Sequence, residues 1–275
     1  SIIVMELLAD PVEARHEIIK ISDRFHLWFG LCRQVLDLYH TDEAFVYTDS
    51  KVSNVGYDPK SGKLRLIDLG SALLGSDGTY IASFPPPLKQ NAAGKTIVSV
   101  TKGNIGTTNG KDKDLAVAHM MAYSMGILLL SVIGMDYGFI PSSLDWKSKK
   151  ENWIWGKTRD PDQIVLCPEG KQAGEATEVT LADGRVCLVE IPAGITPGGY
   201  FDLYIGPENI RDEIYSEILR RYPEISKQLN DSITGTLDKF MGCKFESVDA
   251  IEDYVRNHAP SSEFWEARNN AAAEA

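Results

Sequence analysis

Four side chains in the first quarter of the sequence carry groups that bind divalent cations or move protons. Asp49, Lys51 and Asn54 supply a carboxylate, an amine and a carboxamide from one short segment, and Asp68 supplies a second carboxylate further along. Transfer of a phosphoryl group depends mainly on positioning and on neutralising charge, so it needs carboxylate and amide oxygens that converge on Mg²⁺. These four residues predict such a site, provided that the fold brings them together.

A hairpin would bring Asn54 and Asp68 together. The runs 54–58 and 63–67 alternate or are apolar, and Asp58-Pro59-Lys60-Ser61-Gly62 between them has the composition of a turn. The sequence therefore predicts two short antiparallel strands with the candidate metal ligands at their open ends. The alternative is an Asp-rich hairpin whose carboxylates only cap turns.

The pattern Asp49-x-Lys51-x-x-Asn54, followed by Asp68-x-Gly70, resembles the catalytic loop and the metal-binding turn of protein kinases. This resemblance implies that Asp49 accepts the proton of the incoming hydroxyl and that Lys51 lies beside the transferred phosphoryl group. It also implies that Asn54 and Asp68 bind Mg²⁺ and that ATP is the phosphoryl donor.

Further segments resemble the same family, in the family's order. Residues 2–8 are similar to the last small-lobe strand of a kinase as it enters the hinge, which implies nucleotide contacts from Glu6, Leu7 and Leu8. Residues 31–40 resemble the helix before the catalytic loop, residues 123–130 the central helix of the large lobe, and residues 237–265 its closing helices. The implied fold class is α+β, a mainly helical kinase large lobe with short β hairpins.

The sequence also departs from the kinase pattern. It begins at the hinge-like segment, so we expect the N-terminal lobe, with its glycine-rich loop and ATP-anchoring lysine, to be absent from this chain. Tyr47-Thr48 replaces the family's His-Arg, and Met121 replaces the central-helix Asp that ties down the catalytic loop. No Ala-Pro-Glu follows Gly70. Without the family's Arg before Asp49, a phosphorylated activation loop has no evident cation to bind, so activation by loop phosphorylation is not expected.

The composition is that of a folded protein with an acidic surface. The 275 residues are 43% hydrophobic and 24% charged, which is ample for a core, and the formal net charge is -11. Repulsion from this negative charge excludes nucleic acid as a main partner and limits membrane contact to a peripheral one. We expect a protein partner or a larger assembly.

The cysteines give no signal for zinc or redox chemistry. Cys32, Cys167, Cys187 and Cys243 lie far apart and form no CxxC pair, so we expect reduced and mostly buried thiols.

We expect an intracellular protein, cytoplasmic or organellar. The run 67–72 also resembles a segment of thylakoid protein kinases, which implies a plastid as one candidate compartment.

Two segments after the metal-binding turn need an assignment. Residues 71–114 are rich in Gly, Ser, Thr and Pro, and we expect a long loop equivalent to a kinase activation segment, stiffened by prolines at 85–87. Residues 115–135 are almost uninterrupted apolar sequence, long enough to cross a bilayer. The preferred interpretation is the buried central helix of the large lobe.

An internal repeat follows the central helix. Cys167-Pro168-Glu169-Gly170, followed by Gly174, recurs 24 residues later as Ile191-Pro192-Ala193-Gly194, followed by Gly198. Each copy leads into alternating residues, and residues 182–185 predict a hairpin turn. The repeat predicts a small inserted β module, similar to the β repeats of chaperone substrate-binding domains. Its edge strands could pair with the backbone of a partner, and the alternative is an insertion packed on its own lobe.

Helices are expected again after residue 209. Ile210, Ile214, Ile218 and Leu219 are predicted to share one helix face, and Ser247 is predicted to cap a helix over 248–257.

These patterns divide the chain into a hinge, catalytic loop and central helix (1–140), an insertion with the β repeat (141–208) and closing helices (209–275). The expected function is ATP-dependent phosphoryl transfer to protein Ser or Thr, incomplete or impaired in the isolated chain. One alternative is a pseudokinase that acts as a scaffold or interaction subunit. A small-molecule kinase of the aminoglycoside or choline type is the other, and Lys51 argues against it.

Overall fold

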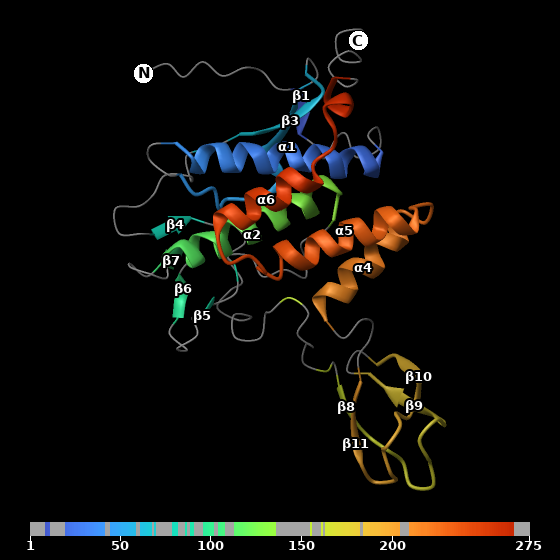
Figure 1. Cartoon of the computed structure of the whole chain (residues 1–275). Coiled ribbons are helices and arrows are strands. Elements are labelled where there is room, and N and C mark those ends of the chain that lie inside the picture. Colours follow the sequence, from blue (N-terminus) through green and yellow to red (C-terminus); the bar gives the residue numbers. More distant parts are fainter. Residues whose placement is uncertain are drawn as a thin grey trace. The chain divides into compact units, whose positions relative to one another are not determined.

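Helices alternate with short antiparallel sheets along the chain, so the protein is of the α+β class, as predicted (Figure 1). The computed structural model describes residues 9–11, 20–41, 45–58, 61–67, 69, 79–81, 86, 89–90, 96–101, 104–107, 113–135, 155, 161, 163–181, 184–203 and 209–266. One compact unit comprises residues 1–155 and 217–275, and a second comprises residues 156–216.

Helix α2 (Lys113–Val132) lies at the centre of the first unit. Every residue from Ala116 to Ile133 is buried, and helices α1 (Ile21–Tyr39), α5 (Lys227–Phe240) and α6 (Val248–His258) contact it (Figure 1). Within the described part of the chain it alone is long and apolar enough to span a membrane, and 94% of that stretch is buried inside the protein. A helix that is apolar on all sides needs such a surround. The prediction of a buried central helix is confirmed.

Helix α1 joins this core to the hairpin that carries the candidate site. Its apolar face is buried, and the Trp28 indole Nε1 donates to the Met125 carbonyl oxygen of α2 at 2.8 Å. On its other side, the Gln34 side-chain amide bonds to the backbone of residues 64–66 as a neighbouring strand would. Its Nε2 donates to Leu64 O at 2.9 Å, and its Oε1 accepts from Leu66 N at 3.1 Å. The carboxamide thus satisfies an otherwise open strand edge.

That hairpin consists of β2 (Val55–Asp58) and β3 (Lys63–Leu66), and β1 (Ala9–Pro11) pairs with the other side of β2. The two hairpin strands are antiparallel, with Val55 opposite Leu66 and Asp58 opposite Lys63. Gly62 takes a positive φ of 62° in the turn, a conformation in which glycine carries no steric cost. The predicted hairpin is confirmed.

The prediction of a long loop over residues 71–114 is wrong in part. Four short strands lie within it and form an antiparallel sheet in the order β4 (Thr79–Ile81), β7 (Asn104–Thr107), β6 (Thr96–Thr101), β5 (Lys89–Gln90). The longest strand, β6, reads Thr-Ile-Val-Ser-Val-Thr, and β-branched residues favour extended backbone. The proline run lies mostly outside the described residues; of it, Pro86 is described and buried.

In the C-terminal helices one prediction is confirmed and one is wrong. Ser247 caps α6 by accepting a hydrogen bond from Ala250 N at 3.2 Å, as predicted. In α4 (Ile210–Arg221), Ile214 and Ile218 are buried, but Leu219 is 50% exposed, so its assignment to the apolar face is wrong. One residue advances a helix by about 100°, which turns position 219 away from the row of 214 and 218.

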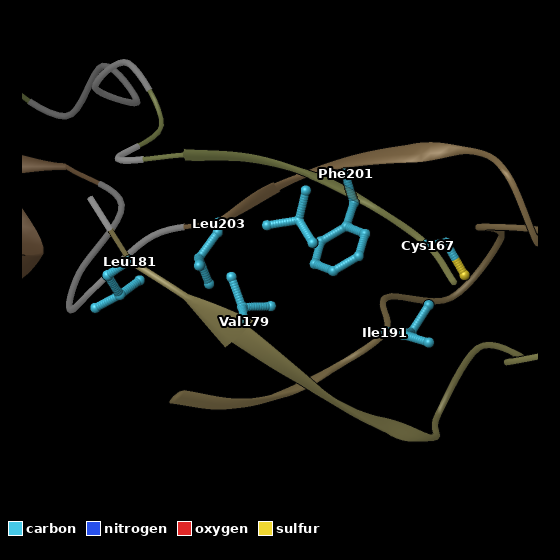
Figure 2. Packing of buried hydrophobic residues seen from close by; sticks show 7 residues of the cluster. Cys167, Val179, Leu181, Ile191, Phe201 and Leu203 are labelled. Atoms are coloured by element: carbon cyan, nitrogen blue, oxygen red, sulfur yellow. The ribbon is translucent and has the colours of Figure 1, made fainter. Parts of the chain in front are cut away.

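The second unit contains two sheets of two strands each. Strand β8 (Gln163–Leu166) pairs with β11 (Tyr200–Leu203), and β9 (Ala176–Thr180) pairs with β10 (Val186–Glu190), both antiparallel. The β9–β10 pair confirms the hairpin predicted around residues 182–185. Side chains from the two sheets converge on one small apolar core, formed by Val165, Cys167, Val179, Leu181, Ile191, Phe201 and Leu203 (Figure 2).

The two copies of the repeat are joined by equivalent backbone hydrogen bonds in both directions. Gly174 N donates to Ile191 O at 2.8 Å, and the residues 24 positions away from these repeat the bond, with Gly198 N donating to Cys167 O at 3.0 Å. Gly170, Gly174, Gly194 and Gly198 all have positive φ, between 79° and 86°. The Pro-x-Gly-x-x-x-Gly pattern therefore encodes two equivalent turns related by an internal two-fold pseudo-symmetry.

Candidate functional site

The candidate catalytic loop lies inside the first unit rather than on a mobile surface loop. Residues 46–50 are all buried, although Thr48, Asp49 and Ser50 are polar. Helix η2 (Val52–Asn54) follows and leads directly into β2. Buried polar groups require hydrogen-bond partners, and the loop obtains them from its own side chains and from α2.

Asp49 is the centre of this network. Its Oδ2 accepts from Lys51 Nζ at 2.9 Å and from Asn54 Nδ2 at 3.0 Å. Its backbone oxygen accepts from Asn54 Nδ2 at 2.9 Å and from the Tyr47 hydroxyl at 3.2 Å. Three of the predicted site residues are therefore brought together, and the charge of Lys51 compensates a carboxylate that is only 6% exposed.

The orientation of Asn54 bears on its predicted role as a metal ligand. Because Nδ2 donates to the Oδ2 and the backbone oxygen of Asp49, the carboxamide turns its oxygen away from Asp49, and no described residue donates a hydrogen bond to Oδ1. An amide oxygen is the kind of ligand that Mg²⁺ prefers. Asn54 thus fits the predicted role. No cluster of three His, Cys, Asp or Glu side chains suited to a metal occurs among the described residues.

Asp68 and the hinge-like residues cannot be placed in the same way. Asp68, Glu6, Leu7 and Leu8 lie outside the described residues. Their chain neighbours are described: Ile67 N donates to Asn54 O at 2.9 Å, and β1, which begins one residue after Leu8, pairs with β2. Each predicted segment is therefore next in sequence to described residues that bond to Asn54 or pair with β2.

Ser124 is a residue of this site that sequence reasoning missed. From α2 its Oγ donates to Tyr47 O at 2.8 Å, and it also makes a short contact with Ser50 Oγ. Met121, one turn earlier, is fully buried and apolar. A neutral hydroxyl three residues after Met121 thus bonds the loop to the central helix.

Two pockets of the first unit lie away from Asp49. The larger, of about 510 Å³, lies between α1, β3 and residues 260–266, and Arg33, Lys63 and Trp265 are among the residues that line it. The smaller, of about 220 Å³, is lined by α1 and α6. Neither includes Asp49, Lys51 or Asn54, so neither is a candidate nucleotide pocket for this loop.

Comparison with known proteins adds no assignment to this geometry, because no protein-family model, curated protein or solved structure matches the chain.

Proposed function

We propose that this chain carries the large lobe of a protein kinase-like enzyme that transfers the γ-phosphoryl group of ATP to a Ser or Thr hydroxyl of a protein. The observation that carries the proposal is the Asp49 carboxylate held by both Lys51 and Asn54 while the Asn54 Oδ1 faces elsewhere. In an arbitrary Asp-rich turn, the carboxylates cap the turn itself. Asp58 in the same hairpin does this, through Ser61.

Each described side chain has a distinct role in this proposal. Asp49 orients the incoming hydroxyl and accepts its proton, and Asn54 keeps the carboxylate in place through two hydrogen bonds. Lys51 holds positive charge beside the phosphoryl group that moves, and its side chain is 35% exposed and so within reach of a substrate. Asn54 Oδ1, with Asp68, would hold Mg²⁺, which supplies charge that neutralises the phosphates.

A pair of matched variants tests the proposal. Phosphoryl transfer from radiolabelled MgATP to a mixture of Ser- and Thr-containing peptides is measured for this chain, or for any longer protein that contains it. Asp49→Asn should lower transfer by about 10²–10⁴-fold, because the proton acceptor is lost. Asp58→Asn should leave it within a few-fold, since Asp58 is an equally buried carboxylate that bonds to Ser61 and Arg65 of its own hairpin. Equal effects of both variants would contradict the assignment.

A pseudokinase scaffold is the second candidate function. The observation that favours it is the second unit, whose strands expose large apolar side chains, Ile164, Leu166, Val186, Leu188 and Tyr200. In that case Asp49 and Lys51 form a structural ion pair, and Asp49→Asn leaves partner binding unchanged. No transfer by any protein that contains the chain, under conditions where it binds MgATP, would support this candidate over the first.

A further inference from the structure

The outer face of the β8–β11 sheet exposes a continuous apolar surface. Alternation along the two strands points Val165, Phe201 and Leu203 into the core, so their neighbours point outward. Of these, Ile164 is 63% exposed, Leu166 is 52% exposed and Tyr200 is 67% exposed. Leu166 and Tyr200 are directly opposite each other, and Ile164 is opposite Asp202.

The internal repeat indicates that the fold itself does not require large apolar residues at positions 166 and 200, whereas Ile164 has an apolar equivalent in Leu188. A shift of 24 positions relates the β8–β11 sheet to the β10–β9 sheet, which has the same turns and matching hydrogen bonds. At the positions equivalent to Leu166 and Tyr200, the other sheet carries Glu190 and Ala176, both of them exposed. The same backbone is thus built with a charged and a small residue, so the large apolar pair on β8–β11 serves something other than folding.

We propose that the outer face of β8–β11 is a docking surface for a segment of a partner protein that carries aliphatic side chains interspersed with Lys or Arg. The apolar surface of Ile164, Leu166 and Tyr200 would be buried by the aliphatic side chains. The basic residues would pair with Asp202, which lies on the same face opposite Ile164. This docking is independent of whether Asp49 is catalytic.

The negative charge of the second unit favours a basic partner segment over other occupants of this face. Residues 163–203 contain Glu169, Glu175, Glu178, Asp183, Glu190 and Asp202 against Lys171 and Arg185. Acidic groups outnumber basic ones in this segment, as in the whole chain with its net charge of -11. A second copy of the chain, or an anionic bilayer, would bring like charges together, whereas a basic segment is attracted.

The test uses the full chain and a labelled synthetic peptide that alternates Val and Lys, with an alternating Val and Glu peptide for comparison. Fluorescence anisotropy measures binding. The wild-type chain should bind the Val–Lys peptide at least about tenfold more tightly than the Val–Glu peptide, and this preference should shrink with added salt. Equal affinity for the two peptides would overturn the proposal.

Two variants locate the surface. Leu166→Ser combined with Tyr200→Ala removes the large apolar pair without adding charge and should weaken Val–Lys binding by about tenfold or more. Leu188→Thr is the control, because Leu188 is 73% exposed on the other sheet; it should leave the affinity unchanged. Equal losses in both variants would reject this face as the site. A wild-type dimer that the double variant dissociates, seen by sedimentation, would assign the face to a second copy instead.

Discussion

A buried aspartate needs neighbouring groups that compensate its negative charge, and Lys51 and Asn54 are such neighbours of Asp49. Lys51 supplies the charge, Asn54 donates to both the side chain and the backbone of Asp49, and the Tyr47 hydroxyl donates to the Asp49 backbone oxygen. Ser124 then fixes the backbone of Tyr47 from outside the loop. The position of the Asp49 carboxylate therefore depends on neutral hydroxyl groups as well as on charge.

Removal of the Ser124 hydroxyl should loosen this loop. Ser124→Ala leaves Tyr47 O buried without that donor, and we expect the free energy of unfolding to fall by about 1–3 kcal/mol. Urea denaturation measures it. Ser232→Ala is the control, since the exposed Ser232 hydroxyl bonds to Gln228 O within α5. That substitution should cost much less, and a cost as large as that of Ser124→Ala would argue against a specific tie.

The acid dependence of stability has one traceable contributor at this scale. Hydrogen bonds from Arg220, and then from Arg221, lower the pKa of Glu217 from its usual 4.5 to about 2. Because the folded-state pKa lies below the unfolded one, the stabilisation is present above pH 4.5 and is lost as the pH falls toward 2.

We therefore expect Glu217→Gln to flatten the pH dependence of the free energy of unfolding between pH 4.5 and 2. Chemical denaturation across that range measures it. Glu224→Gln is the comparison, because Glu224 is exposed and makes no ion pair with described residues. A pH dependence that is the same in wild type and Glu217→Gln would show that the Arg220 and Arg221 contacts do not form in solution.

The sequence predicted much of this site because its signals are local. Asp49, Lys51 and Asn54 lie within one turn of chain, and the hairpin composition sets where Ile67 returns to Asn54. Ser124 could not be predicted in the same way, because its partner is 77 residues away and a serine on an apolar helix has several structural uses. The signal available was a polar residue at a position that α2 buries completely.

Among the elements, the packing of α2 against α5 depends on a glycine. A Cβ at Gly126 would lie 2.7 Å from Met241 Sδ and 3.1 Å from Met241 N, just past the end of α5. The absence of a side chain lets the two helices approach closely. Sequence patterns assign Gly126 to the helix but do not reveal this contact, because the partner residue is distant in sequence.

Gly126→Ala and Gly235→Ala should therefore act in opposite directions. The first forces Met241 to move and should lower the free energy of unfolding by about 1–3 kcal/mol. Gly235, within α5, has open space where a Cβ would lie, so alanine there should add about 0.5–1 kcal/mol of helix stability. Thermal or urea unfolding of the two variants measures this difference. Destabilisation by both substitutions would show that Gly235 has no room for a Cβ atom in solution.

The strands within residues 71–114 show the opposite limitation of sequence reasoning. Their glycine-, serine- and proline-rich surroundings indicate a loop, and only the β-branched run of β6 stands out locally. Pairing across β4, β7, β6 and β5 decides the outcome, and such pairing is non-local. The β module was more predictable because its repeat presents the same turn signal twice.

For the whole molecule, two separate cores imply separate unfolding. The core around Phe201 is confined to the second unit, whereas Phe240 is buried with Trp28 in the first. We expect calorimetry to show two transitions. Phe201→Ala should destabilise one of them by about 3–5 kcal/mol, and Phe240→Ala should do the same to the other. A single transition shifted by both variants would show that the units unfold as one.

The stretch from β8 to β11, residues 163–203, begins and ends at neighbouring points, since Gln163 at the start of β8 is directly opposite Leu203 at the end of β11. Paired antiparallel residues have Cα atoms about 5 Å apart. A surface loop can therefore accept or lose this stretch with almost no change in the span between its own ends. Because its ends are close together, a protein can acquire this stretch as an insertion in a loop. The same geometry would allow it to be moved by design to another loop of similar span.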